Sequence, residues 1–127
     1  MTERQKMQSR EEAAKFCQTF EDVYIDYPFD DNWVAARHKG NKKCFAFIFE
    51  RNGRIWVNVK CDPEWCDLWR TEYASVLPAY HMNKTYWNSV ILDGSVSEGR
   101  ICDMIAESYA ITKERPEKET PRRKEKA

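Results

Sequence analysis

The tetrapeptide Arg51-Asn52-Gly53-Arg54 constrains the fold of this chain more than any other stretch. Asn and Gly tolerate the positive φ angles of a two-residue turn, so this pair between two strand-like runs predicts a tight β-hairpin. The runs are Lys43–Glu50, dense in Phe and Ile, and Arg54–Lys60, in which Ile and Val alternate with other residues. A turn at residues 39–42 joins Lys43–Glu50 to a further strand, Trp33–His38. The sequence therefore predicts a three-stranded antiparallel meander.

The two-residue turn also fixes which side chains share a face of the sheet. The predicted pairs are Arg51 with Arg54, Phe49 with Trp56, Phe47 with Asn58, and Phe45 with Lys60. The face that holds these pairs mixes aromatic, basic and amide groups, whereas the opposite face is small and aliphatic and suits packing against helices. The pattern leaves open whether the aromatic face is covered or forms an exposed platform.

The chain before the meander is predicted to begin with a helix. Ser9 and Glu12 form a capping box, and the apolar residues after them recur at helical spacing, so we expect an amphipathic helix over about residues 9–21. Pro28 and the acidic residues that follow it oppose a continuing helix. A turn-rich connection is therefore expected to lead into the first strand.

A second helix is predicted directly after the meander. Asp62 followed by Pro63 is an N-cap pattern, and the helix is expected to end near Glu72. Its expected buried stripe consists of Trp65, Leu68 and Trp69.

The following segment is predicted to hold two strands and a third helix. A short strand is expected at Ala79–Met82, after the lead-in Val76–Pro78, and a longer one at Tyr86–Leu92. Ser95 and Glu98 form a second capping box ahead of apolar residues at helical spacing, which predicts the last helix.

The expected order is therefore α-β-β-β-α-β-β-α, with an antiparallel sheet of about five strands. Helices gathered on one face of such a sheet give a two-layer α+β sandwich. We expect a single domain over residues 9–112, preceded by a flexible N-terminus over residues 1–8. The charged segment 113–127 has almost nothing to bury and is expected to be a disordered tail.

Charge and hydropathy narrow the class of protein. The longest apolar run, Cys44–Phe49, has six residues, far fewer than a membrane span needs, and the charged start has no apolar signal region. We therefore expect a cytoplasmic protein that makes no contact with a membrane. The formal net charge is zero, yet residues 37–60 hold seven Lys or Arg against one Asp or Glu. This segregation favours one basic surface, although charged hairpins can also serve solubility alone.

The cysteines give no metal-binding or catalytic pattern. An odd number of thiols without a signal peptide indicates reduced cysteines. No C-x-x-C pair occurs, and His38 and His81 are the only imidazoles, so no metal site is expected. The five cysteines are Cys17, Cys44, Cys61, Cys66 and Cys102.

One segment resembles the signature region of the MmcQ/YjbR family, and the resemblance extends over about residues 10–112. It is carried by Lys60, Asp62-Pro63-Glu64, Pro78-Ala79-Tyr80-His81-Met82-Asn83-Lys84, Trp87-Asn88 and Leu92-Asp93-Gly94, with Tyr27-Pro28-Phe29 before the meander. The resemblance implies an α+β sandwich similar to the secretion-chaperone-like or CyaY-like fold. It also implies a small bacterial protein that binds DNA.

The basic residues of the meander form the candidate nucleic-acid site. Cations on hairpin turns can contact phosphates on either side of a groove, and aromatic side chains beside them can stack on unpaired bases. The acidic charge of the remaining folded chain and the lack of a helix-turn-helix pattern oppose this interpretation. The candidate residues are Arg37, Lys39, Lys42, Lys43, Arg51, Arg54, Trp56 and Lys60.

The signature segment is a second candidate site. An imidazole, a cation and amides close to a strand could bind an anionic or carbonyl-bearing ligand or transfer protons. Alternatively, its asparagines shape the turn, its Trp fills the core and its Lys pairs with an acidic neighbour. The chain offers no activated nucleophile and no Gly-rich phosphate loop, so a non-enzymatic protein without a cofactor is expected. The candidate residues are His81, Asn83, Lys84, Trp87 and Asn88.

Protein interaction is the alternative function. The aromatic sheet face, or the apolar side of the helix that contains Trp65 and Trp69, could bind a partner protein or a second copy of this chain. The simpler interpretation of the same residues is that aromatic side chains in a small domain form its core.

Overall fold

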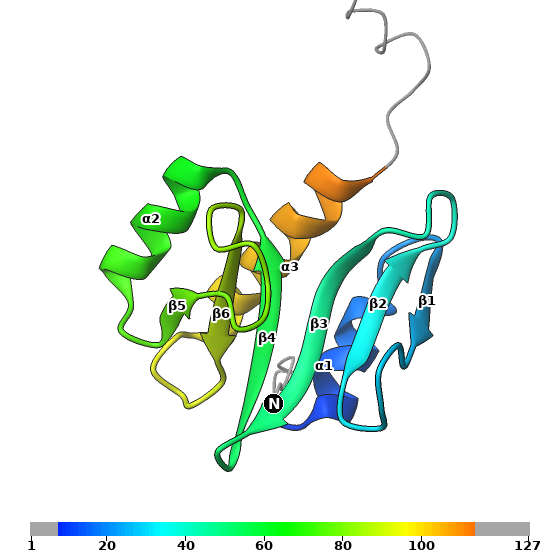
Figure 1. The fold of residues 1–127 in the computed structure, drawn as a ribbon, viewed down its shortest axis with the longest axis horizontal. Coiled ribbons are helices and arrows are strands. Elements are labelled where there is room, and N and C mark those ends of the chain that lie inside the picture. The colour runs from blue at the N-terminus through cyan, green and yellow to red at the C-terminus, as the bar shows by residue number, and fades with distance from the viewer. Residues whose placement is uncertain (1–7, 114–127) are drawn as a thin grey trace, which may run out of the picture.

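The structure is a computed structural model that describes residues 8–113 (Figure 1). The six strands form one antiparallel sheet in the order β1-β2-β3-β4-β6-β5. The expected flexible N-terminus and disordered tail lie, apart from Gln8 and Lys113, outside the described residues. The elements are α1 (Arg10–Cys17), β1 (Val23–Asp26), β2 (Val34–His38), β3 (Cys44–Arg51), β4 (Arg54–Lys60), α2 (Pro63–Glu72), β5 (Val76–Pro78), β6 (Trp87–Ile91) and α3 (Glu98–Thr112).

The Asn-Gly hairpin joins the two central strands, β3 and β4. Asn52 and Gly53 have φ angles of +55° and +76°, as the predicted turn requires. The two strands pair in the predicted register: Arg51 with Arg54, Phe49 with Trp56 and Phe47 with Asn58. The turn chemistry therefore sets the two faces of the sheet at its centre.

Phe45 departs from the predicted alternation. The pairing of β2 with β3 shifts by one residue at this point, so Phe45 is an extra residue without a partner on β2. Its ring is fully buried and packs against Phe20 and Tyr109, with centroid distances of 6.0 and 5.2 Å. The prediction that Phe45 faces Lys60 on the aromatic face is therefore wrong, because the bulge redirects the side chain.

The sheet has one strand more than the sequence predicts. β1 is only four residues long and half-buried throughout, so it has neither a continuous apolar run nor a strict alternation. It pairs with β2 over its whole length, which makes the order α-β-β-β-β-α-β-β-α. The short strand β5 is Val76–Pro78 and not the expected Ala79–Met82, since His81 has a φ of +63° that an extended strand cannot accommodate. The α+β class and the antiparallel sheet are confirmed.

The core lies between the sheet and two helices. α1 and α3 both pack against the centre of the sheet and lie behind it in Figure 1. They cover the aliphatic face predicted from the hairpin. The buried residues of this core include Ile48, Val57 and Val59 from the strands, Ala13 and Cys17 from α1, and Ile101, Met104 and Ile105 from α3.

The helix caps match the sequence only in part. Ser9 caps α1 as predicted, and its hydroxyl accepts a hydrogen bond from the backbone N–H of Glu12 at 3.0 Å. The helix ends at Cys17, earlier than the expected residue 21. α3 is capped by Ser97 and not by Ser95, whose hydroxyl donates to Asp93 instead.

The expected buried stripe of α2 is wrong at Trp65 and Leu68 and holds only at Trp69, which is half-buried against the core. α2 contacts the edge strand β5 and its neighbour β6 and stands beside the sheet (Figure 1). Its buried residue is Cys66, whereas Trp65 and Leu68 are 45% and 49% exposed. A helix at a sheet edge buries a narrower face than one over the centre, so part of the apolar stripe stays in solvent.

Two of the five cysteines form a disulfide, which corrects the expectation of five reduced thiols. Cys61 and Cys66 are joined across the start of α2, with a Cα–Cα distance of 5.8 Å that suits such a bridge. Cys17, Cys44 and Cys102 are free. Burial raises the pKa of the half-buried Cys44 to about 12, so its thiol stays protonated and unreactive near neutral pH.

Residues 8–113 contain no helix that is both long enough and apolar enough to cross a membrane. Within the same range, no three His, Cys, Asp or Glu side chains are grouped so that they could hold a metal ion.

Candidate functional site

The face of the sheet turned away from α1 and α3 is called the open face here. The register places on it the aromatic, basic and amide side chains that the hairpin pattern predicts. Its members on the central strands include Phe47, Phe49, Trp56, Asn58 and Lys60, together with Trp87 and Ser89 from β6.

One half of the open face is covered by the loop between β5 and β6, which crosses in front of β4 (Figure 1). Asn58 donates a hydrogen bond to the carbonyl oxygen of Tyr80 at 3.0 Å, and the hydroxyl of Ser89 accepts one from the Tyr80 N–H at 2.9 Å. The same hydroxyl donates to Asn58. Since Asn58 and Ser89 are fully buried, this polar set fixes the loop to the sheet.

An aromatic stack fills the space beneath that loop. The ring of Trp33 lies 3.9 Å from that of Phe49, and Tyr80 packs against Phe49 and Trp56 at 5.8 and 6.1 Å. The guanidinium of Arg51 lies over the rings of Tyr80 and Trp56 at 4.2 and 4.9 Å. Trp56 is only 7% exposed, so a base could reach its ring only if Tyr80 and Arg51 moved away.

The other half of the open face holds an uncovered aromatic row. Phe29 stacks on Phe47 with a centroid distance of 6.3 Å, and Phe47 contacts Trp87 at 6.1 Å. Phe29 is 69% exposed although Trp33 supports its edge at 5.7 Å. The sequence interpretation missed Phe29, because a residue in a Pro- and Asp-rich connection carries no strand or helix signal.

The basic hairpin turns lie at opposite ends of β3. The β2–β3 turn carries Lys39, Lys42 and Lys43, all exposed, and the β3–β4 turn carries Arg54, also exposed. Since β3 has eight residues, its ends are about 23 Å apart at the usual rise of a strand. The two turns therefore form separate basic sites at opposite ends of β3.

Two of the predicted basic residues are already engaged. Arg37 donates to Oδ2 of Asp26 at 3.1 Å and to the Lys42 carbonyl oxygen at 3.0 Å. Arg51 is held over the aromatic stack. Arg54 lies near the carboxylate of Asp93. The pKa of Asp93 is lowered to about 2, mainly by hydrogen bonds from Ser75 and Ser95 and to a smaller extent by the charge of Arg54.

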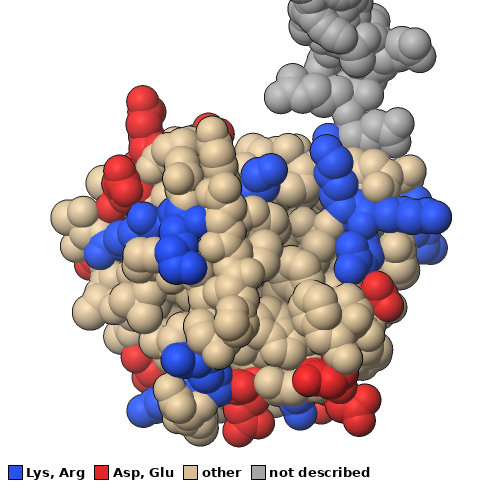
Figure 2. Space-filling model, viewed as in Figure 1, with Lys and Arg blue, Asp and Glu red and all other residues tan. Residues whose placement is uncertain are grey.

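Figure 2 shows how charge is distributed over the open face. Lys and Arg lie over its sides, near the β2–β3 turn, the β3–β4 turn and the region of α2 and the β5–β6 loop. The middle is uncharged, and Asp and Glu lie mainly at the margins of this view. A polyanion that crosses the face would therefore meet cations at several separate points.

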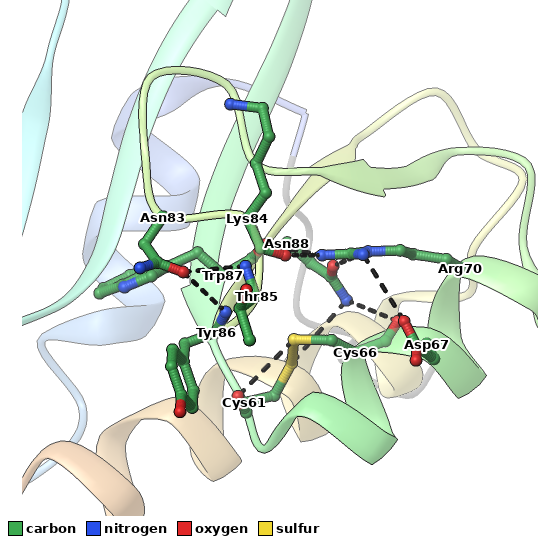
Figure 3. A network of polar contacts seen from close by, with 10 residues as sticks. All are labelled: Cys61, Cys66, Asp67, Arg70, Asn83, Lys84, Thr85, Tyr86, Trp87 and Asn88. Atoms are coloured by element: carbon green, nitrogen blue, oxygen red, sulfur yellow. Dashed lines mark hydrogen bonds and ion pairs between the residues drawn. A yellow bond between two sulfur atoms is a disulfide. The ribbon is translucent and has the colours of Figure 1, made fainter.

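The signature segment is organised by Arg70 of α2 (Figure 3). Its Nε donates to Oδ1 of Asn88 at 2.6 Å, and its Nη2 donates to the carbonyl oxygens of Lys84 and, at 3.2 Å, Trp87. Asn88 is buried and also donates to the carbonyl oxygen of Cys66 at 3.2 Å. Arg70 and Asn88 thus join α2, the disulfide and β6, and Asn88 cannot contact a ligand.

The exposed members of the signature segment are His81, Asn83 and Lys84. Asn83 shapes the turn, since its Oδ1 accepts the backbone N–H groups of Thr85 at 2.8 Å and Tyr86 at 3.3 Å. The Lys84 side chain points away from the Arg70 network (Figure 3), and within residues 8–113 its ammonium makes no ion pair. Within the described residues, the Lys84 ammonium donates to the Met82 carbonyl oxygen at 3.4 Å, and the structure gives it no acidic partner.

Comparison with known proteins identifies relatives of this chain. The family model described as YjbR matches residues 18–111. The Bacillus subtilis protein YyaQ is 33% identical over 119 residues, which cover 84% of this chain and all of that protein. The Escherichia coli protein YjbR is 34% identical over 79 residues, which cover 62% of this chain and 67% of that protein.

Two solved structures have the same fold. A Deinococcus radiodurans protein of the DUF419 domain family superposes with a TM-score of 0.79 and 25% identity, over 94% of this chain and 91% of that one. A Pseudomonas syringae protein superposes with a TM-score of 0.73 and 26% identity, over 83% of this chain and 99% of that one. Sequence and structure agree, and the chain belongs to the YjbR family.

Proposed function

We propose that this protein binds nucleic acid, DNA in the first instance, across the open face of its sheet. The observation that carries the proposal is the distribution of charge in Figure 2, in which separate groups of Lys and Arg lie around an uncharged centre. Phosphates spaced along a strand are the ligands that such an arrangement suits, since each cation can neutralise one of them.

The two layers of the fold differ in charge, which supports this orientation. The segment from Arg37 to Lys60, which forms most of the sheet, carries a net charge of +6. The three helices carry eight Asp or Glu against four Lys or Arg. A polyanion would therefore be attracted by the part of the sheet formed by β2, β3 and β4 and repelled by the helices. The edge around β1 does not share this positive charge, since residues 18–33 carry five Asp or Glu and no Lys or Arg.

The β2–β3 turn provides cations on a fixed support. Asn41 donates to the carbonyl oxygen of Thr112 at 3.0 Å, and Nε2 of His38 lies 2.8 Å from the Thr112 hydroxyl. The turn is therefore attached to the end of α3, while Lys42 and Lys43 remain exposed. We place the strongest phosphate contact here.

Fluorescence anisotropy with labelled duplex and single-stranded DNA over a salt series tests the proposal. For duplex DNA, the slope of log affinity against log salt concentration should be about −0.9 per phosphate contacted. The double variant Lys42→Glu, Lys43→Glu should weaken binding and flatten this slope. The matched control is Lys15→Glu on α1, behind the sheet, which should change binding much less. Absence of binding at about 50 mM salt would overturn the proposal.

A partner protein bound on α2 is the second candidate function. A groove of about 350 Å³ between α2 and α3 is lined by Trp65, Leu68, Trp69, Tyr73 and Arg100, among others. Exposed apolar side chains next to such a groove are typical of an interaction surface. Sedimentation velocity over a concentration series tests self-association, which Leu68→Glu should abolish. Because half of the open face is covered by its own loop, α2 suits this function better than the aromatic sheet face does.

A further inference from the structure

We propose that the uncovered row Phe29–Phe47–Trp87 stacks on unpaired bases, so that the ligand of the open face is single-stranded nucleic acid. This inference rests on the proposed function and specifies its ligand class. It assigns base contacts to this row and not to Trp56 and Phe49 of the buried stack, to which Trp33 joins the row.

Phe29 is the exposed end of the row, and Phe47 and Trp87 are half-buried. Phe29 and Phe47 are nearly parallel, with an angle of 20° between their planes, and Trp87 continues the row at an angle of 48° to Phe47. Trp33 packs edge-on against Phe29 at 81° and holds it in place. Phe29 nonetheless leaves 69% of its surface in solvent. A flat apolar ligand could stack there without displacing any residue.

Two lysines lie near the Trp87 end of the row. Lys60 is the cross-strand neighbour of Trp87 on the same face, which places it one strand away. Lys84 lies in the loop directly before β6, and its side chain points away from the Arg70 network (Figure 3). A base on Trp87 would therefore have a lysine available for its adjoining phosphate. An uncharged aromatic ligand would make no use of these two lysines.

Base stacking distinguishes a single strand from a duplex. In a duplex the bases are paired and stacked on one another, so their flat sides cannot reach a protein surface without strand opening. In a single strand each base can stack on an aromatic side chain with little dependence on its identity. We therefore expect binding to single strands of mixed sequence, with tolerance for base type.

The test compares two probes of equal length and charge, an oligothymidylate of about 12 nucleotides and its fully abasic counterpart. Both present the same phosphates, and only the first presents bases. The wild-type chain should bind the oligothymidylate on the order of tenfold more tightly than the abasic strand. Phe29→Ala should remove most of that difference and leave affinity for the abasic strand unchanged.

Tyr27→Ala is the matched control. Tyr27 is 58% exposed and lies two residues before Phe29, but it belongs to no aromatic pair within residues 8–113. This variant should keep the preference for the oligothymidylate. Because Phe29 is mostly exposed, its truncation should leave the melting temperature nearly unchanged, which separates a lost contact from a lost fold.

The possible outcomes separate this inference from the function on which it depends. Equal, salt-dependent binding of both probes would overturn base stacking and retain phosphate binding. Loss of both would overturn the proposed function itself. Preference for the oligothymidylate that survives Phe29→Ala would also overturn the assignment to this row.

Discussion

Nε of Arg70 on α2 donates a hydrogen bond to Oδ1 of the buried Asn88 on β6 at 2.6 Å. Through the same guanidinium, α2 also holds the carbonyl oxygens of Lys84 and Trp87. The loop that carries the exposed part of the signature segment is thus positioned from a helix outside the sheet. Asn88 maintains this geometry from inside the fold, whereas His81, Asn83 and Lys84 are exposed.

Replacing Asn88 by Ala should lower the free energy of unfolding by about 2–3 kcal/mol, because it removes the hydrogen bonds that the buried Asn88 makes with the Cys66 carbonyl oxygen and with Nε of Arg70. Urea denaturation followed by circular dichroism measures this change. Asn83→Ala is the control within the same segment, since Asn83 is exposed and its loss should cost about 1 kcal/mol or less. If Asn88→Ala were as stable as the wild type, the structural role of Asn88 would be wrong.

The disulfide predicts the number of reactive thiols. Under denaturing, non-reducing conditions, iodoacetamide should modify three of the five cysteines, because Cys61 and Cys66 are joined. Mass spectrometry counts the additions, and prior reduction should raise the number to five. Closing so short a loop contributes about 2 kcal/mol to stability in the chain-entropy model, so reduction should also lower the melting temperature. Five additions without reduction would show that the bridge is absent.

The central hairpin could be predicted because its information is local. Asn52 and Gly53 determine the turn, and the turn determines the register of Phe49 with Trp56. Phe45 and the strand β1 could not be predicted in this way. The bulge at Phe45 depends on how β3 pairs with β2. The strand β1 forms because it pairs with β2, and its own residues have no alternation that would predict a strand.

The candidate site was predictable as a set of residue types and not as an arrangement. Charge counts along the chain identify the basic hairpins, but they do not indicate that Arg37 is paired with Asp26. Alternation places Trp56 on the correct face, but only the fold of the β5–β6 loop shows that Tyr80 covers it. Phe29 becomes a candidate only when its contact with Phe47 is known, since that contact joins residues far apart in sequence.

Trp56 should stabilise the fold and should not contact a ligand directly. Trp56→Ala should lower the free energy of unfolding by about 3–5 kcal/mol, as large-to-small replacements in a packed interior do. Its indole N–H also donates to the Arg51 carbonyl oxygen at 3.1 Å, and that contact would be lost. Trp65→Ala, at an exposed position of α2, is the control and should cost less than half as much. Thermal and urea unfolding measure both losses of stability. If Trp56→Ala and Trp65→Ala lowered the free energy of unfolding equally, the different burial of the two rings would be contradicted.

Asp93 should make the protein less stable in acid. Hydrogen bonds from the hydroxyls of Ser75 at 2.6 Å and Ser95 at 2.7 Å favour the carboxylate and lower its pKa from 3.8 to about 2. A carboxyl group whose pKa is lower in the folded than in the unfolded chain stabilises the fold above the unfolded value. That contribution is lost as the pH falls from about 4 to about 2. Because Asp93 is exposed, solvent screens part of the effect.

Melting temperatures of the wild type and Asp93→Asn between pH 2 and pH 6 measure the contribution of Asp93. Their difference should be largest near pH 6 and should shrink through the interval in which the carboxyl group titrates. Ser75→Ala removes the first of the two hydroxyl donors, so it should raise the pKa of Asp93 and move the loss of stability to higher pH. A difference between wild type and Asp93→Asn that stayed constant down to pH 2 would show that Asp93 does not titrate as its hydrogen bonds imply.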